Sequence, residues 1–301
     1  MGLFDDNRAT IASVVGTAVI VLGAGRSAAQ PADPIRIFPT RAVAAARQPA
    51  ATQANPAPVG CGVTPGGLDY HGGPVMHKAR HRSLWWGTDG FDVDIQKHVA
   101  KFFAHFGRSG EYETITQYGD AEGLVQAAHL SGSRKVDPSP PPSIVSDLDV
   151  QAELRANFDN RRLGRPNEST LYYVFLPNGV TSTAYGMTSC VEYCAYHSYF
   201  DLDGMAIKYA VVPYPSCWGC QGYQLPDMSA AASSVTIFTA HETREAVTDP
   251  LLNAWWDSAT GMEADDRCAW QLFVDPDDGM QYQLEWSLAA NGCVQKGICG
   301  P

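Results

Sequence analysis

The amino-acid sequence predicts an α/β protein, with α+β as the alternative fold class: a single domain with a mixed sheet, crosslinked by disulfides. Three observations favour this prediction: helical and strand-like patterns alternate along the chain, the apolar strands are short, and all eight cysteines lie beyond residue 60. Hydrophobic residues make up 45% of the 301 residues and charged residues 18%. This composition can build a large core and excludes disorder as the main state.

The chain is acidic, with 21 Lys and Arg against 32 Asp and Glu and a formal net charge of −11. Nucleic-acid affinity depends largely on basic side chains that displace counterions from phosphates. No basic stripe is visible along the sequence. We therefore expect no nucleic-acid partner.

The N-terminus has the pattern of an export signal over residues 1–29. An uncharged, largely apolar run, Ala9–Gly25, lies between Arg8 and Arg26 and is followed by Ser27-Ala28-Ala29, which suits a signal peptidase. The alternative is an uncleaved anchor, since the run is just long enough to span a bilayer. We expect a secreted, extracellular protein without membrane contact after cleavage.

Residues 30–60 are rich in Pro and Ala and contain few large apolar side chains. Such a stretch buries too little surface to offset the entropy of ordering it, which predicts a loose linker. We expect the folded domain to span residues 61–301, a suitable length for one domain.

The first half of that domain contains two predicted helices and one predicted strand. Apolar residues recur at near-helical spacing over Asp92–Gly107, which predicts an amphipathic helix. Tyr112–Tyr118 alternates like a strand, and a Pro-rich loop follows. Val150–Leu163 resumes a helical pattern behind Asp147 or Asp149 as its cap.

The second half predicts buried strands around one long helix. Leu171–Leu176 and Ile207–Val212 are short apolar runs ended by Pro, which is typical of buried strands. Ser233–Val247 is predicted as a half-buried helix. Gln271–Val274 and Gln281–Trp286 flank a polar turn and predict a hairpin.

The cysteines allow two interpretations. An even number in an exported chain indicates up to four disulfides. The alternative is a zinc ribbon built from Cys190-x3-Cys194 and Cys217-x2-Cys220, whose spacings fit zinc ligands. We favour disulfides, because exported thiols are normally oxidised.

The predicted helix at 233–247 carries the sequence HETRE, in which His241 and Glu245 are four residues apart. This spacing places both side chains on one face of a zincin-like helix, as in H-E-x-x-H zinc helices, with Glu in place of the second His. Zinc accepts such a carboxylate and keeps an open position in catalytic sites. Glu242 then has the place of a general base that takes a proton from water.

A different interpretation is a charged helical face in which Glu242 or Glu245 pairs with Arg244 or with a residue elsewhere. If the site binds zinc, a third ligand must come from another segment. We rank His197 first, Glu263 and Asp266 next, and Asp249 last.

Several motifs resemble a known family. Tyr70-His71-Gly72-Gly73-Pro74-Val75 looks like the YHGGPV opening of the Exordium, or phosphate-induced protein 1, family. Cys190-x3-Cys194-x2-His197 and the segment from Glu263 to Cys268 are similar to its later motifs, and HETREAVTDP resembles the form in bacterial relatives. The resemblance covers roughly Leu68 to Cys299. It implies a secreted, disulfide-bonded protein, and plant members are linked to the extracellular matrix.

Two function hypotheses follow from these patterns. The first is a secreted zinc-dependent hydrolase, a metallopeptidase with a peptide or protein substrate. The alternative is a non-catalytic envelope protein of the Exordium type that binds matrix or cell-envelope polysaccharide. The pairs Trp85-Trp86 and Trp255-Trp256 and the single Trp218 would then stack on sugars, although core packing is the commoner role of Trp.

Overall fold

The computed structural model describes residues 36–47, 67–130 and 132–298. The segment Pro34–Pro301 forms one compact unit. The predicted signal peptide lies outside the described residues and stays a prediction. In the part of the chain that the structure describes, none of the helices combines the length and apolar character needed to cross a membrane.

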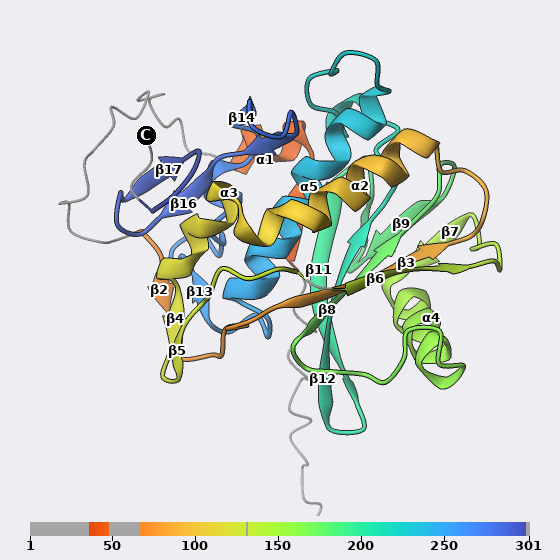
Figure 1. The fold of residues 1–301 in the computed structure, drawn as a ribbon, viewed down its shortest axis with the longest axis horizontal. Helices are drawn as coiled ribbons and strands as arrows, with labels where there is room; N and C mark the ends of the chain where they lie inside the picture. The colour runs from red at the N-terminus through yellow and green to blue at the C-terminus, as the bar shows by residue number, and fades with distance from the viewer. Residues whose placement is uncertain (1–35, 48–66, 131, 299–301) are drawn as a thin grey trace, which may run out of the picture. The chain divides into compact units, whose positions relative to one another are not determined.

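The centre of the unit is a six-stranded mixed sheet (Figure 1), which confirms the predicted α/β class. Its strands, in spatial order, are β1 (Arg36–Pro39), β11 (Tyr193–Leu202), β12 (Met205–Val212), β8 (Thr170–Phe175), β3 (Arg80–Trp86) and β6 (Gly132–Asp137). The strands β12, β8, β3 and β6 are parallel, whereas β1 and β12 are both antiparallel to β11. The predicted strands at 171–176 and 207–212 are confirmed as β8 and β12.

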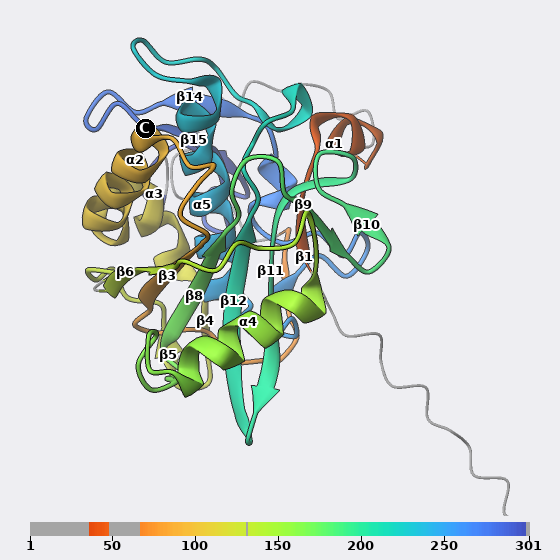
Figure 2. The ribbon, with the colours of Figure 1, turned by 90° about the vertical axis from the view of Figure 1, so that its right-hand side faces the viewer.

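Helices cover both faces of this sheet (Figure 2). The helices α2 (Val93–His105) and α5 (Ala230–Thr248) share one core with Tyr173 and Phe175 of β8. On the other face, α4 (Asp147–Asp159) shares a core with Tyr172 and Val174. Because both faces of β8 are covered, the strand is a continuous apolar run rather than an alternating one.

The helix boundaries follow from their caps. The helix predicted at 92–107 is confirmed as α2, which begins after Asp92, whose side chain accepts a hydrogen bond from the Ile95 N–H. Helix α4 begins earlier than expected, because Ser146 is its cap and Asp149 closes a capping box from the third helical position. Helix α5 begins three residues before Ser233, behind Ser229.

The prediction of a half-buried α5 is wrong, because every residue from Ala231 to Thr248 is buried. The hairpin of β14 (Leu272–Val274) and β15 (Gln281–Gln283), which confirms the predicted hairpin, provides part of the cover. The Thr236 hydroxyl on α5 donates a 2.7 Å hydrogen bond to the Gln281 carbonyl on β15.

The predicted strand at 112–118 is wrong. These residues form α3 (Gly110–Glu113) and a single 3-10 turn, Thr114–Gln117. Tyr112, Ile115 and Tyr118 are all buried, and their spacing of three suits a tight helix rather than a strand.

The predicted linker is also wrong for part of its length. Arg36–Pro39 forms β1 at the edge of the main sheet, and Arg41–Arg47 forms the helix α1. Ile37 and Phe38 are both buried, one on each side of the sheet. Two apolar side chains and a free sheet edge are enough to order a short strand that its Pro- and Ala-rich surroundings conceal.

The remaining strands form small sheets around the main one. They are β2 (Asp69–Tyr70) with β13 (Trp255–Trp256), β4 (Gly119–Asp120) with β5 (Gly123–Leu124), β16 (Glu285–Ser287) with β17 (Gly292–Val294), and β9 (Thr181–Ala184) between β7 (Ile144–Ser146) and β10 (Met187–Thr188). Further 3-10 turns lie at Phe106–Arg108, Trp218–Cys220 and Asp266–Cys268.

Three disulfides crosslink the unit: Cys190–Cys217, Cys194–Cys220 and Cys268–Cys293. They confirm the disulfide interpretation, and the zinc ribbon is wrong because its four cysteines are bonded in pairs. Cys61 and Cys299 lie outside the described residues.

Candidate metal centre

The first two side chains of the site come from α5. His241 Nε2 and Glu245 Oε2 lie 2.9 Å apart, which confirms that the four-residue spacing puts them on one face. Their geometry is not that of a hydrogen bond, and neither atom has another hydrogen-bond partner among the described residues. Two such atoms that face each other in the interior could both bind one metal ion.

Strand β11 brings His197 to the same helix. His197 Nδ1 forms a 3.1 Å hydrogen bond with Glu242 Oε2 and lies 3.8 Å from Glu245 Oε2. Its other nitrogen, Nε2, lies 3.8 Å from Glu263 Oε1. The strand packs beneath α5, so a side chain on this face of β11 meets the helix.

The loop after α5 supplies two further carboxylates. Asp266 Oδ1 lies 3.9 Å from His241 Nε2, and the Asp266 N–H donates a 3.0 Å hydrogen bond to Glu245 Oε1. The neighbouring Cys268 is bonded to Cys293, which ties this loop to β17.

These side chains form a single buried group that we call the His/carboxylate cluster. Its members are His197, His241, Glu242, Glu245, Glu263 and Asp266. Except for Asp249, it brings together the candidate ligands proposed from the sequence and the candidate base Glu242.

Within the cluster, two triads have ligand atoms within 4.8 Å of one another: His241, Glu245 and Asp266, and His197, Glu242 and Glu245. The expected set of His197, His241 and Glu245 is thus divided between two triads that share Glu245. Either triad could hold a metal ion. Ligand atoms about 2.0–2.1 Å from one tetrahedral zinc ion lie roughly 3.3 Å apart. The 2.9 and 3.9 Å distances around His241 Nε2 bracket this value.

The interpretation in which Arg244 pairs with Glu242 or Glu245 is not what the structure shows. The Arg244 guanidinium binds Asp265, through Nε at 3.0 Å and through Nη2, and its Nε lies 2.5 Å from Glu285 Oε2. Burial alone would lower the pKa of Arg244, but Asp265 and Glu285 raise it above its usual value.

Burial dominates the electrostatics of the cluster. It raises the pKa of Glu242, Glu245 and Glu263 well above the usual value, and nearby carboxylates raise it further. Burial likewise raises the pKa of Asp266 and lowers that of His197 well below its usual value. Ionised carboxylates are costly in such a place unless a cation compensates them.

Three further residues lie beside the cluster. Asp249 Oδ1 accepts hydrogen bonds of 2.6 Å from the N–H groups of both Asn253 and Ala254 and so caps the turn after α5. It belongs to neither triad. Arg36 on β1 lies 3.5 Å from Glu263 through Nε, and the Phe38 ring meets the His241 ring edge-on at 4.5 Å.

Sequence reasoning missed Arg36 and Phe38, because the composition of residues 30–60 predicts a linker. A weak signal was available in Arg36-Ile37-Phe38. In an extended chain, Arg36 and Phe38 point to the same side.

The cluster has little open space beside it. Five of its six members have no exposed surface, and Asp266 is 9% exposed. The cavity next to Asp266 has a volume of about 10 Å³ and is lined by Pro39, Ala44, Arg47, Met262, Asp266 and Ala269. Because β1 and α1 contribute lining residues, these two elements cover the cluster beside Asp266, its one partly exposed member.

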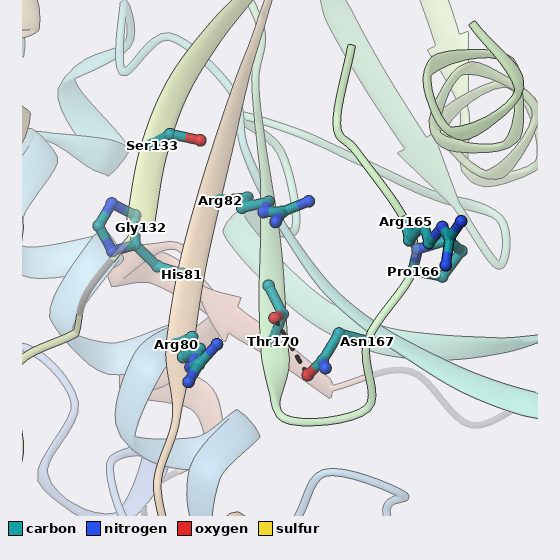
Figure 3. Close-up of a pocket in the computed structure, with 9 residues that line it drawn as sticks. All are labelled: Arg80, His81, Arg82, Gly132, Ser133, Arg165, Pro166, Asn167 and Thr170. Carbon is teal, nitrogen blue, oxygen red and sulfur yellow. Dashed lines mark hydrogen bonds between the residues drawn. The ribbon is translucent and has the colours of Figure 1, made fainter. Parts of the chain in front are cut away.

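A larger cavity of about 620 Å³ lies elsewhere, where the parallel strands β3, β6 and β8 begin. Figure 3 shows Arg80 and Arg82 of β3 opposite Arg165 across this cavity, with His81 on the other side of the strand. The lining contains no carboxylate. Its chemistry is therefore cationic, unlike that of the His/carboxylate cluster.

The tryptophans do not form one surface. Trp85 and Trp86 are buried in the two opposite cores, whereas Trp218 is 80% exposed. Trp255 and Trp256 are half-buried in β13.

Comparison with known proteins adds no relative, since no family model, curated protein or solved structure matches this chain.

Proposed function

We propose that this protein is a secreted, zinc-dependent hydrolase that acts as a metallopeptidase. The observation that carries the proposal is the convergence of buried ligand atoms without hydrogen bonds, from His241, Glu245 and Asp266, on one small volume. Three protein ligands that leave a fourth position open are typical of catalytic zinc sites. Imidazole and carboxylate donors together suit zinc, although they do not select it alone.

We assign the proton-transfer role to Glu242. Its Oε2 is held by His197, and its Oε1 has no hydrogen-bond partner among the described residues. Zinc, when bound, polarises a substrate carbonyl and lowers the pKa of water toward neutrality. Glu242 takes the proton from the attacking water, and its raised pKa allows it to keep that proton and pass it to the leaving amine.

The export part of the proposal rests on the N-terminal pattern and on the disulfides, which persist in oxidising compartments. The resemblance to the Exordium family agrees with export and remains a prediction.

The test combines zinc content with peptide hydrolysis. We expect refolded protein lacking residues 1–29 to retain one zinc ion per chain and to cleave members of a mixed peptide library. Glu242→Gln should keep the zinc and lower the hydrolysis rate by roughly 10²–10⁴-fold, the usual contribution of a general base. Glu168→Gln, on an exposed loop, is the matched control. Zinc-free protein, or equal rates for the wild type and Glu242→Gln, would contradict the proposal.

One observation favours a second candidate, a non-catalytic extracellular protein of the Exordium type with a structural metal. The cluster is almost fully buried, as expected for a structural site. In that case zinc is retained, and neither the wild type nor Glu242→Gln hydrolyses peptides. The exposed Trp218 is then a candidate contact to matrix polysaccharide.

A further inference from the structure

Strand β1 occupies the outer edge of the main sheet, beside the strand that carries His197. It pairs antiparallel with β11, with Arg36 opposite His197 and Phe38 opposite Ala195. It has only four residues. Its pairing with β11 is made of main-chain hydrogen bonds, which any extended peptide could make in its place.

The side chains of β1 alternate between the two faces of the sheet. Ile37 joins the core beneath α4, whereas Arg36 and Phe38 point toward α5 and the His/carboxylate cluster. The Arg36 guanidinium donates a 3.0 Å hydrogen bond to the Gly261 carbonyl through Nη1 and lies 3.5 Å from Glu263 through Nε. A basic side chain at this position is therefore favoured by the Glu263 carboxylate and the Gly261 carbonyl.

The Phe38 ring fills an aromatic pocket. Its centroid lies 4.5 Å from that of His241 and 5.0 Å from those of Phe238 and Trp270. The Trp270 indole N–H donates a 2.9 Å hydrogen bond to the Pro39 carbonyl. This pocket fixes an aromatic residue two positions after the basic one and directly against a proposed zinc ligand.

We propose that the edge of β11 is a binding site for an extended peptide and that Arg36–Pro39 occupies it as an intramolecular ligand. The preferred peptide carries a basic residue and, two residues later, an aromatic residue. This inference rests on the proposed function, because a peptide bound at this edge lies against the cluster. It also explains why the cluster is covered: the chain's own β1 lies where the substrate belongs.

The experiment measures binding of a labelled peptide before and after β1 is cut from the domain. A site-specific protease sequence is introduced after Arg47 in the full chain, and the probe is a fluorescein-labelled PIRIFPTR peptide, residues 34–41. A tethered strand competes at an effective concentration on the order of millimolar. We therefore expect the cut chain to bind the probe at least roughly 100-fold more tightly than the uncut chain in fluorescence anisotropy.

The peptide sequence supplies the matched controls. Replacing Phe38 of the probe by Ala should weaken binding by about 10-fold or more. Replacing Arg36 by Ala should also weaken it, through loss of the contacts to Gly261 and Glu263, and a scrambled peptide should not bind. Equal binding by cut and uncut chains overturns the proposal, as does loss of the far-UV circular dichroism signal when β1 is displaced, because the domain would then not stay folded without β1.

A second variant leaves the chain uncut. Phe38→Ala in the full chain should loosen β1 and increase probe binding at least 10-fold, whereas Leu148→Ala, which is 73% exposed on α4, should not. No increase for Phe38→Ala contradicts the proposal. Zinc content is measured on the same proteins, and the binding measurements are repeated in chelator. If the probe binds but the protein retains no zinc, only the proposed function fails. If the protein retains zinc but the probe does not bind, only this inference fails.

Discussion

Replacing Glu245 by Gln should stabilise the metal-free protein and abolish its stabilisation by zinc. Glu245 is shared by both triads and is fully buried. Without a metal ion, burial beside Asp266 makes the ionised form of Glu245 unfavourable in the folded protein, and burial is the main cause of its raised pKa. The Gln side chain has the same shape, and its Oε1 can still accept the hydrogen bond from the Asp266 N–H.

The magnitudes follow from general values. The cost of an unpaired buried ion is several kcal/mol, so we expect Glu245→Gln to stabilise the metal-free protein at pH 8 by about 1–3 kcal/mol. Zinc at 100 times its dissociation constant should stabilise the wild type by about 2.7 kcal/mol. For a domain of this size that is roughly 5–10 °C in Tm. The variant should show no such increase.

The assay is thermal unfolding followed by circular dichroism, with zinc and with chelator. Glu285→Gln is the matched control, because Glu285 is equally buried but pairs with Arg244 and belongs to neither triad. Its own effect on stability should be the same with zinc and with chelator, because Arg244 keeps its ion pair with Asp265, and it should keep the zinc response. A zinc response in Glu245→Gln equal to that of the wild type would refute the reasoning.

Two further predictions concern stability away from the cluster. Burial, followed by the neighbouring Asp137, raises the pKa of Glu153 to about 7. Because the folded pKa lies above the unfolded one, the contribution of Glu153 to the free energy of unfolding is complete below about pH 4.5 and is lost as pH rises through 7. In urea unfolding, Glu153→Gln should therefore be about 1 kcal/mol more stable than the wild type at pH 8 and little different at pH 4. The partial exposure of Glu153 keeps this difference small. A gain independent of pH would argue against this cause. The Cys268–Cys293 bond spans 25 residues, so replacing both cysteines by Ser should cost about 3.5 kcal/mol and weaken zinc binding in calorimetric titration, because the bond ties down the loop of Glu263 and Asp266; unchanged zinc affinity would show that the loop is held without it.

The part of the site that the sequence predicts best is the part set by local geometry. The separation of His241 and Glu245 follows from the helical repeat alone. The candidates Glu242, His197, Glu263 and Asp266 required the expectation that these side chains come together in the fold, and they lie in one cluster. The order in which they were ranked is not tested, and the triad of His241 contains Asp266 rather than His197.

Contacts between distant segments could not be predicted in this way. The pairing of β1 with β11 joins residues that are far apart in the sequence, such as Arg36 and His197, and composition alone indicates a linker over residues 30–60. The partners of Arg244 were missed for a related reason. The local pattern offers Glu242 and Glu245, whereas the fold brings Asp265 and Glu285 to the Arg244 guanidinium.

The most direct test of the central claim is an anomalous-scattering map at the zinc edge, measured on crystals equilibrated with zinc. The proposal predicts one strong peak within about 2.0–2.2 Å of His241 Nε2, Glu245 Oε2 and Asp266 Oδ1, and no peak in crystals of Glu245→Gln. A map of the wild type without density at the cluster, or with zinc only at surface residues, would contradict it.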